Sequence, residues 1–191
     1  MNKIVIIGKN GFVASNLINE LKKYKKTNTK IISFSKQKYN LLSIQSVKKI
    51  NKNIKDADIV VFCAADAPVK NLRQLNNNIL MLNNFFNYTD NIKNFFFLYL
   101  SSDAVYKDTK ILLNENSKIE YSGSLHGMMH IFRESIVKSF INNKRLCIVR
   151  PTLIYGPNDP HNSYGPNKFI RSFLNKEDIT LFGRGEERRD H

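Results

Sequence analysis

Short runs of consecutive apolar residues alternate along the chain with longer segments in which apolar residues recur every three or four positions. The short runs predict buried strands, and the longer segments predict helices that each present one apolar face. The predicted strands cover residues 3–8, 30–35, 58–65, 94–102 and 145–151, and the predicted helices cover 12–23, 43–53, 71–88, 124–142 and 168–175. Strands that are apolar throughout and alternate with helices are typical of an α/β fold with a parallel sheet covered on both faces.

The order of these elements predicts a doubly wound, Rossmann-like sheet, because crossovers between parallel strands are right-handed. The amino-acid composition changes after Pro151. Residues 152–168 are rich in Gly, Pro and Asn, which predicts a long loop. We therefore expect one domain over residues 1–150 and the beginning of a smaller C-terminal domain over residues 151–191. The chain ends on charged residues without a closing element, which indicates a truncated gene product or a fragment.

Composition and charge bound the partners of the chain. Lysine and arginine number 30 against 16 acidic residues, and the net charge of +14 could attract a polyanion such as nucleic acid. Apart from a cluster in residues 21–30 the basic residues are scattered, so we expect a solvated basic surface and no nucleic-acid partner. The longest apolar run, residues 95–100, is too short to span a bilayer, and the N-terminal run is too short for a signal peptide. We therefore expect a cytoplasmic protein that is not bound to a membrane.

The two cysteines, Cys63 and Cys147, both lie in apolar runs that predict buried strands. A free cysteine in such a place behaves as a small hydrophobic residue. The pattern does not indicate a secreted, disulfide-stapled chain.

A glycine-rich turn follows the first predicted strand in the segment GKNGFVAS, with Gly8 and Gly11 three residues apart and Ala14 where a third small residue is useful. Glycine permits the tight bend and a close approach of backbone to a pyrophosphate, and the following helix offers free N–H groups. A plain tight turn would give the same residues. The position between a strand and an amphipathic helix favours nucleotide binding.

The end of the second predicted strand bears on the choice between NAD and NADP. Residues 33–38 contain no acidic side chain that could bind a ribose 2′-hydroxyl. Ser35 and Lys36 could instead accommodate a 2′-phosphate. The cofactor is therefore expected to be NAD or NADP, with a preference for NADP.

Taken together, the segments GKNGFVASNL, VVFCAADA, LYLSSDAVY and VRPTLIYGP resemble the extended short-chain dehydrogenase/reductase family, the NAD-dependent epimerases and dehydratases of nucleotide sugars. The resemblance implies a Rossmann domain for NAD(P) over residues 1–150 and a partial substrate-binding region over 151–191. The cofactor contacts that it implies are Gly8, Gly11, Phe12, Val13, Asn40, Ala64 and Ala65. The other roles that it implies are a structural asparagine at Asn77, an active-site hydroxyl at Ser102, a substrate-binding loop at residues 150–157 and a diphosphate-binding arginine at Arg189.

The segment SLHGMMHIFRE places His126, His130 and Glu134 at four-residue steps on one face of a predicted helix. By resemblance this helix carries the family's Tyr-x-x-x-Lys motif, and the spacing aligns His126 with the tyrosine and His130 with the lysine. Tyr121 does not restore the motif, because its fourth follower is Leu125.

Three interpretations of this face remain. His126 could do the work of the tyrosine, since an imidazole exchanges protons near neutral pH, while His130 contacts the cofactor ribose as a hydrogen-bond donor. Catalysis could instead be lost, leaving a Rossmann module that only binds a nucleotide. A metal site built from the two histidines and Glu134 is the least favoured, because no further ligand is evident, and no metal is expected.

The residues after the fourth predicted strand limit the reaction. Dehydratases of the family place an acidic pair after the active-site hydroxyl, and here Asp103 is followed by Ala104. We therefore favour an epimerase or reductase of a nucleotide-linked sugar over a dehydratase. The expected catalytic residues are Ser102, Asp103, His126 and His130, with Ser102 and Arg189 binding the substrate. By resemblance the helices at 71–88 and 124–142 form a homodimer surface.

Overall fold

A computed structural model describes residues 2–24, 28–89, 94–121, 123–160 and 165–181. The chain forms two compact units, Met1–Arg150 and Pro151–His191. In the first unit a five-stranded sheet has the order β2-β1-β3-β4-β5, and all neighbouring strands are parallel. The strands are β1 (Asn2–Ile7), β2 (Thr29–Phe34), β3 (Ile59–Phe62), β4 (Phe96–Leu100) and β5 (Leu146–Val149). The predicted parallel α/β sheet is confirmed, although β3, β4 and β5 are shorter than the apolar runs that contain them.

Four α-helices connect or follow these strands, and local side chains explain where three of them begin. They are α1 (Phe12–Lys23), α2 (Ile44–Ile54), α3 (Leu72–Asn87) and α4 (Leu125–Phe140), with short 3-10 helices η1 (Asp103–Val105) and η2 (Asn143–Arg145). The side chains of Ser43, Asn71 and Ser124 each accept a backbone N–H three residues later. These bonds satisfy donors that a helix start leaves without partners.

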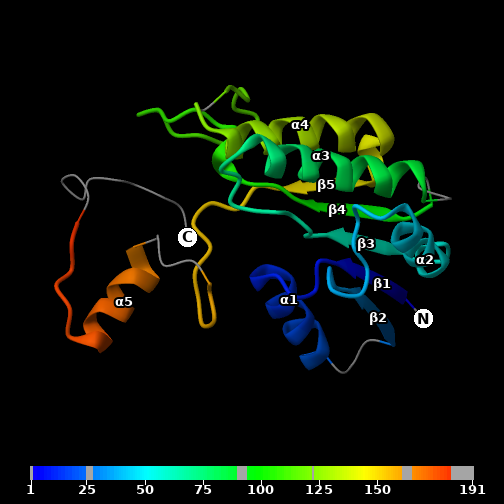
Figure 1. Ribbon diagram of the computed structural model, residues 1–191, viewed down its shortest axis with the longest axis horizontal. Coiled ribbons are helices and arrows are strands. Elements are labelled where there is room, and N and C mark those ends of the chain that lie inside the picture. The colour runs from blue at the N-terminus through cyan, green and yellow to red at the C-terminus, as the bar shows by residue number, and fades with distance from the viewer. Residues whose placement is uncertain (1, 25–27, 90–93, 122, 161–164, 182–191) are drawn as a thin grey trace. The chain divides into compact units, whose positions relative to one another are not determined.

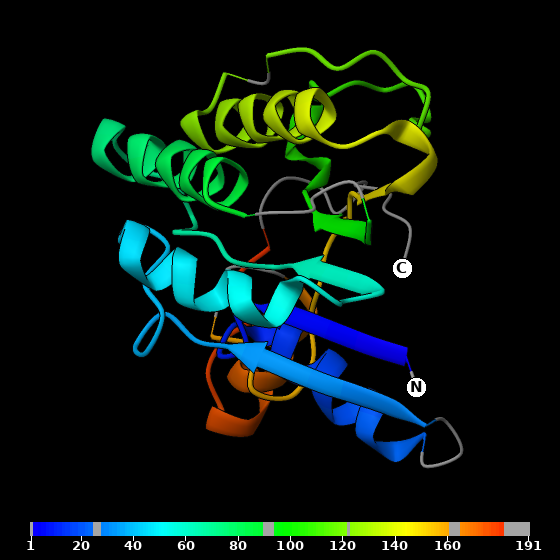
Figure 2. The ribbon, with the colours of Figure 1, turned by 90° about the vertical axis from the view of Figure 1, so that its right-hand side faces the viewer.

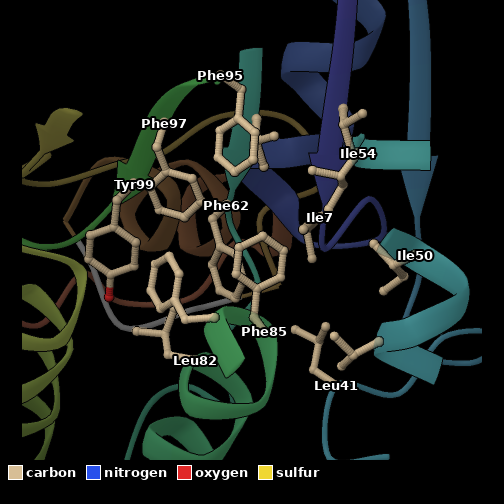
Figure 3. Packing of buried hydrophobic residues seen from close by; sticks show 14 of the residues in the cluster. Ile7, Leu41, Ile50, Ile54, Phe62, Leu82, Phe85, Phe95, Phe97 and Tyr99 are labelled. Atoms are coloured by element: carbon tan, nitrogen blue, oxygen red, sulfur yellow. The ribbon is translucent and has the colours of Figure 1, made fainter. Parts of the chain in front are cut away.

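The main hydrophobic core lies between one face of the sheet and helices α2, α3 and α4 (Figures 1 and 2). Aromatic rings from β3, β4 and α3 fill its centre, where Phe62 and Phe85 meet edge to face with ring centroids 5.2 Å apart (Figure 3). Phe97 and Tyr99 of β4 are fully buried in the same cluster. Packing of this kind fixes the strands against α3 and α4, and thereby fixes the loops that leave the sheet.

Helix α1 packs on the opposite face, where a smaller core forms around Ile6, Ala14 and Val61. This face is less completely covered by the described residues of the unit than the first, since Phe96 of β4 and Val149 of β5 remain 39% and 37% exposed. Cys63 and Cys147 are free thiols and half-buried, so the apolar runs that contain them are less deeply buried at these two positions than predicted.

The second unit contains α5 (Gly165–Asn175), which begins three residues before the predicted helix. The buried Asn167 holds the preceding loop to this helix, because its side-chain amide donates to the Gly156 carbonyl and to the Asp159 carboxylate. Within the described residues of both units, no helix combines the length and the hydropathy needed to cross a membrane.

Candidate functional site

The turn between β1 and α1 has the geometry expected of a phosphate-binding loop. Gly8 has φ of +97°, which disfavours a side chain, and a Cβ there would lie 2.8 Å from the Ala64 nitrogen. The N–H groups of Gly8 and Lys9 both donate to the Phe34 carbonyl, at 2.9 and 3.0 Å. The turn is therefore held to the end of β2 and pressed against the loop that follows β3.

Helix α1 presents its N-terminus at this turn. Gly11 is the N-cap and contributes no side-chain bond to the first turn. The backbone N–H groups of Phe12 and Val13 are accordingly left without helical partners, which is the arrangement that binds phosphate groups. Ala14 is fully buried against the sheet, where its small side chain lets the helix approach. These features fit the pyrophosphate of a dinucleotide.

The end of β2 places the predicted ribose-binding residues near the same turn. Ser35 follows the strand directly and is half-buried, while Lys36 is exposed. The side-chain amide of Asn10, in the glycine turn, donates to the Gln37 side chain at 2.9 Å and connects the two loops. Asn40 is exposed, and its side chain accepts the backbone N–H two residues later, so it shapes the turn before α2.

The loop after β3, which contains Ala64 and Ala65, is fastened by a buried asparagine of α3. That residue is Asn78, and the expectation that Asn77 plays this part was wrong by one position. The Asn78 side chain accepts the N–H of Asp66 at 2.9 Å and donates to the Asp66 carbonyl at 2.9 Å. Asn78 is fully buried and Asn77 is only half-buried, because the helical phase turns Asn78 toward the sheet.

A second residue that fastens this loop is Arg133 of α4, which the sequence analysis did not single out. Its guanidinium is 1% exposed, donates to the Ala64 carbonyl at 2.7 Å and to Asn78 Oδ1 at 3.0 Å, and lies over the rings of Phe62 and Tyr99. Burial lowers the pKa of Arg133. A guanidinium nevertheless keeps its proton in proteins, so a full positive charge lies beneath the loop.

Ser102 and Asp103 lie at the carboxyl end of β4, where the chain enters η1. The Ser102 hydroxyl donates to Asp103 Oδ1 at 3.1 Å and accepts the Ala104 N–H at 3.2 Å. Helix η1 packs against α4, the helix that carries both predicted catalytic histidines. The fold thus brings the expected hydroxyl and the expected acid–base pair to neighbouring elements.

The imidazoles of His126 and His130 contact each other edge to face, with ring centroids 4.8 Å apart. His126 is half-buried, and its Nδ1 accepts the Val69 N–H at 3.5 Å, a long bond. His130 is 6% exposed, and its Nδ1 is buried without a hydrogen-bond partner in the described part of the chain. Burial, with smaller contributions from His126 and Arg133, lowers the pKa of His130 to about 3. His130 is therefore neutral at physiological pH.

Glu134 shares the histidine face in sequence but is engaged elsewhere. Its carboxylate accepts two bonds from Arg150, at 2.8 and 2.7 Å, and one from the Ser101 hydroxyl at 2.7 Å. Burial alone would raise the pKa of Glu134, but the bonds from Arg150 and Ser101 outweigh it and hold the pKa below its ordinary value. Among the described residues no three side chains of metal-binding type converge. The structure thus gives Glu134 a different partner from the one that the metal interpretation requires.

The same arginine, which directly follows β5, joins α4 to the segment after η1. Besides binding Glu134, Arg150 donates to the Tyr106 hydroxyl at 2.6 Å and to the Glu115 carbonyl at 3.2 Å. Arg189, the expected diphosphate ligand, lies outside the described residues. Sequence reasoning missed Arg133 and Asn78, and it placed Arg150 in a substrate-binding loop without its bond to Glu134. Only Arg133 had a signal in the sequence, as an arginine on the apolar face of a helix.

Comparison with known proteins identifies the family. Residues 4–191 match the NAD dependent epimerase/dehydratase family. The chain belongs to this family. The resemblance stated from the motifs is therefore confirmed, and so is the Rossmann-like α/β fold. The family is named for NAD-dependent epimerases and dehydratases.

Individual relatives show how the chain compares in length and fold. A dTDP-D-glucose 4,6-dehydratase of Dictyostelium discoideum is 31% identical over this whole chain, which spans 52% of that protein. A UDP-glucuronic acid 4-epimerase from Bacillus cereus, solved with UDP-glucuronic acid and NAD, has a TM-score of 0.73 at 19% identity, over 96% of this chain and 66% of its own. A dTDP-4-dehydrorhamnose reductase from Bacillus anthracis, solved with NADP, has a TM-score of 0.70 at 21% identity, over 92% of this chain and 60% of its own. The chain thus spans about half the length of the curated relative.

Proposed function

We propose that this chain binds NAD(P) and carries the catalytic helix of an epimerase or reductase that acts on a nucleotide-linked sugar. The observation that carries the proposal is the glycine turn, where Gly8 packs on the Ala64 backbone and α1 directs unpartnered N–H groups toward the same place. A bound nicotinamide would accept and return a hydride. The preference for a nucleotide sugar is supported by family membership and by one structural neighbour that was solved with such a substrate.

The chain's own residues would handle the proton. In the proposal the Ser102 hydroxyl holds the reacting oxygen of the substrate, and His126 exchanges a proton with that oxygen. Neutral His130 serves as a hydrogen-bond donor to the cofactor ribose and lies in ring contact with His126. Asp103, hydrogen-bonded to Ser102, orients that hydroxyl. The substrate diphosphate would be bound by Arg189.

Turnover of candidate sugar nucleotides tests the role of His126. The variant His126→Phe should lower the turnover rate about a hundredfold or more, the usual contribution of a positioned acid–base group. Tyr121→Phe is the matched control, because Tyr121 is exposed and lies four residues before Leu125, outside the motif. A rate that survives the first change would remove the proposed role.

We further propose that the cofactor is NADP rather than NAD. Lys36 is exposed immediately after β2 and Ser35 precedes it, with no acidic side chain between residues 33 and 38. Calorimetric titration should show that the unaltered chain binds NADP more tightly than NAD. Lys36→Met should weaken the binding of NADP and leave the binding of NAD unchanged. Lys38→Met is the control, since that ammonium group lies over the Tyr39 ring. Tighter binding of NAD by the unaltered chain would contradict the preference.

A homodimer in the cytoplasm is part of the proposal. Apolar side chains on the outer surfaces of α3 and α4 support it, among them Leu72, Leu80 and Phe132, which are 72%, 43% and 46% exposed. A shallow hollow on α3, lined by Leu72, Leu75, Asn76 and Ile79, lies on the same surface. Light scattering of the purified protein should give twice the chain mass, and a monomer at micromolar concentration would exclude this surface as a stable dimer interface.

A non-catalytic nucleotide-binding module is the second candidate. It is favoured by His130, which stands at the lysine position of the family motif yet is buried and uncharged, so that it supplies no fixed positive charge. Binding of NAD(P) without an absorbance change across a broad panel of sugar nucleotides would support this candidate over the enzyme.

A further inference from the structure

Arg133 is a buried charge that the proposed chemistry leaves without a task. The guanidinium is 1% exposed and lies over two neighbouring aromatic rings, those of Phe62 and Tyr99. It donates to the Ala64 carbonyl, to the Asn78 side-chain oxygen and, more weakly, to the Met129 sulfur. No carboxylate is within hydrogen-bond distance in the described residues, and Nε is buried without a partner there. Burying a charge without a counter-ion is costly, so the position calls for an explanation.

The position of Arg133 relative to the glycine turn offers an explanation for this buried charge. Arg133 donates to the Ala64 carbonyl at 2.7 Å, and the backbone of Ala64 lies directly against Gly8, where an added Cβ would come within 2.8 Å. One residue of loop therefore separates the guanidinium from the turn at which α1 begins. A negative group held by that turn would lie above a buried positive charge with little water between them.

The peptide between Ala64 and Ala65 connects the Arg133 charge to the glycine turn. It is trans, because the only cis bond in the described chain joins Ala67 to Pro68. In a planar trans peptide the N–H points opposite to the C=O, so a carbonyl turned toward Arg133 directs the Ala65 N–H away from the core. That N–H has no acceptor within the described residues, and Ala65 is exposed. The charge on Arg133 also polarises this donor, since hydrogen bonds in a chain strengthen one another.

We infer that Arg133 is a positioning residue that serves as a buried counter-charge for the diphosphate of the bound nucleotide, acting through the Ala64–Ala65 peptide rather than by contact. The inference rests on the proposed nucleotide binding. It implies that Arg133 strengthens binding of the diphosphate group and leaves recognition of the neutral nucleoside unchanged. A purely structural arginine would instead affect both ligands through the position of the loop.

Calorimetric titrations with ADP and with adenosine separate these roles. In Arg133→Met, which keeps length and apolar contact but removes charge, the dissociation constant for ADP should rise about tenfold while that for adenosine is unchanged. Arg133→Lys keeps the positive charge, so its dissociation constant for ADP should stay within about threefold of that of the unaltered chain. The tenfold rise expected for Arg133→Met corresponds to about 1.4 kcal/mol. Arg145→Met is the matched control, since the exposed Arg145 also donates to a backbone carbonyl, that of Asn94.

Each result bears on one conclusion. Equal losses for ADP and adenosine in Arg133→Met, or unchanged ADP binding, would overturn the counter-charge. If Arg133→Met fails to fold, Arg133→Lys decides alone, and a loss of ADP binding in that folded variant would also overturn it. Failure of the unaltered chain to bind ADP would refute the proposed nucleotide binding itself, which is a different outcome from a bound nucleotide that ignores residue 133.

Discussion

The neutral, buried His130 should make the stability of the chain depend on pH in a defined direction. Its pKa is about 3 in the folded chain and about 6.5 in an unfolded chain. Between these values the unfolded chain binds a proton that the folded chain does not, so acidification favours unfolding. The stabilising effect of a neutral His130 is fully present above pH 6.5 and is lost progressively as the pH falls toward 3.

The size of the effect follows from the same two values. Lowering the pH from 7 to 5 should reduce the free energy of unfolding by about 2 kcal/mol through this residue. The figure depends mainly on the unfolded pKa, because a folded pKa anywhere below about 4 gives nearly the same loss at pH 5. Other titratable groups also contribute to the pH dependence of stability. Their contributions cancel when the unaltered chain is compared with a variant changed only at residue 130.

Urea denaturation at pH 7 and pH 5, followed by circular dichroism because the chain lacks tryptophan, measures this quantity. His130→Met should abolish about 2 kcal/mol of the pH dependence, since methionine fills irregular space and does not titrate. His126→Gln is the control and should keep most of it, because burial is the largest cause of the low pKa. The change in the free energy of unfolding between pH 7 and pH 5 should differ between the unaltered chain and His130→Met. Agreement of the two changes within about 0.5 kcal/mol would refute the assignment of a buried neutral imidazole.

Three further substitutions test the contacts around the site. Glu134→Gln should lower the free energy of unfolding by about 2–3 kcal/mol, because it leaves the partly buried Arg150 without its counter-charge. Glu120→Gln is the control and should leave the urea midpoint unchanged, because its ion pair with Lys118 is exposed. Gly8→Ala should cost about 1–3 kcal/mol in the same measurement and abolish ADP binding, and a variant that binds ADP normally would show that the turn is not the phosphate site. Asn78→Ala should destabilise by about 2–4 kcal/mol and Asn77→Ala very little; the reverse order would contradict the helical phase described here.

Sequence patterns predicted the parallel sheet well because its strands are buried and carry continuous apolar runs. The glycine turn after β1 and the alternation of strands and helices are also local signals, and such signals can be recognised in the sequence alone. Strand ends were less predictable. Residues 63–65 and 101–102 are as apolar or small as the strands before them, yet they leave the sheet to form the loops of the site.

The contacts that fasten the site could not be read from spacing. Asn77 and Asn78 are identical in type and adjacent in sequence, and only the rotation of α3 decides which one reaches Asp66. Arg133 and Arg150 meet partners 69 and 16 residues away, so neither bond has a local signature. The face of α4 that looked like a candidate metal site divides in three dimensions, with the histidines in ring contact and Glu134 turned to Arg150.

The unequal covering of the two faces of the sheet has a consequence for how the protein can vary. Along β4, Phe97 and Tyr99 lie in the closed aromatic core, while Phe96 points to the face that remains partly open. A polar replacement should therefore be tolerated at Phe96 and rejected at Phe97, its immediate neighbour. Mutational tolerance in this strand should alternate residue by residue, so that a saturation library read out by folding would reveal the pleat of the sheet directly.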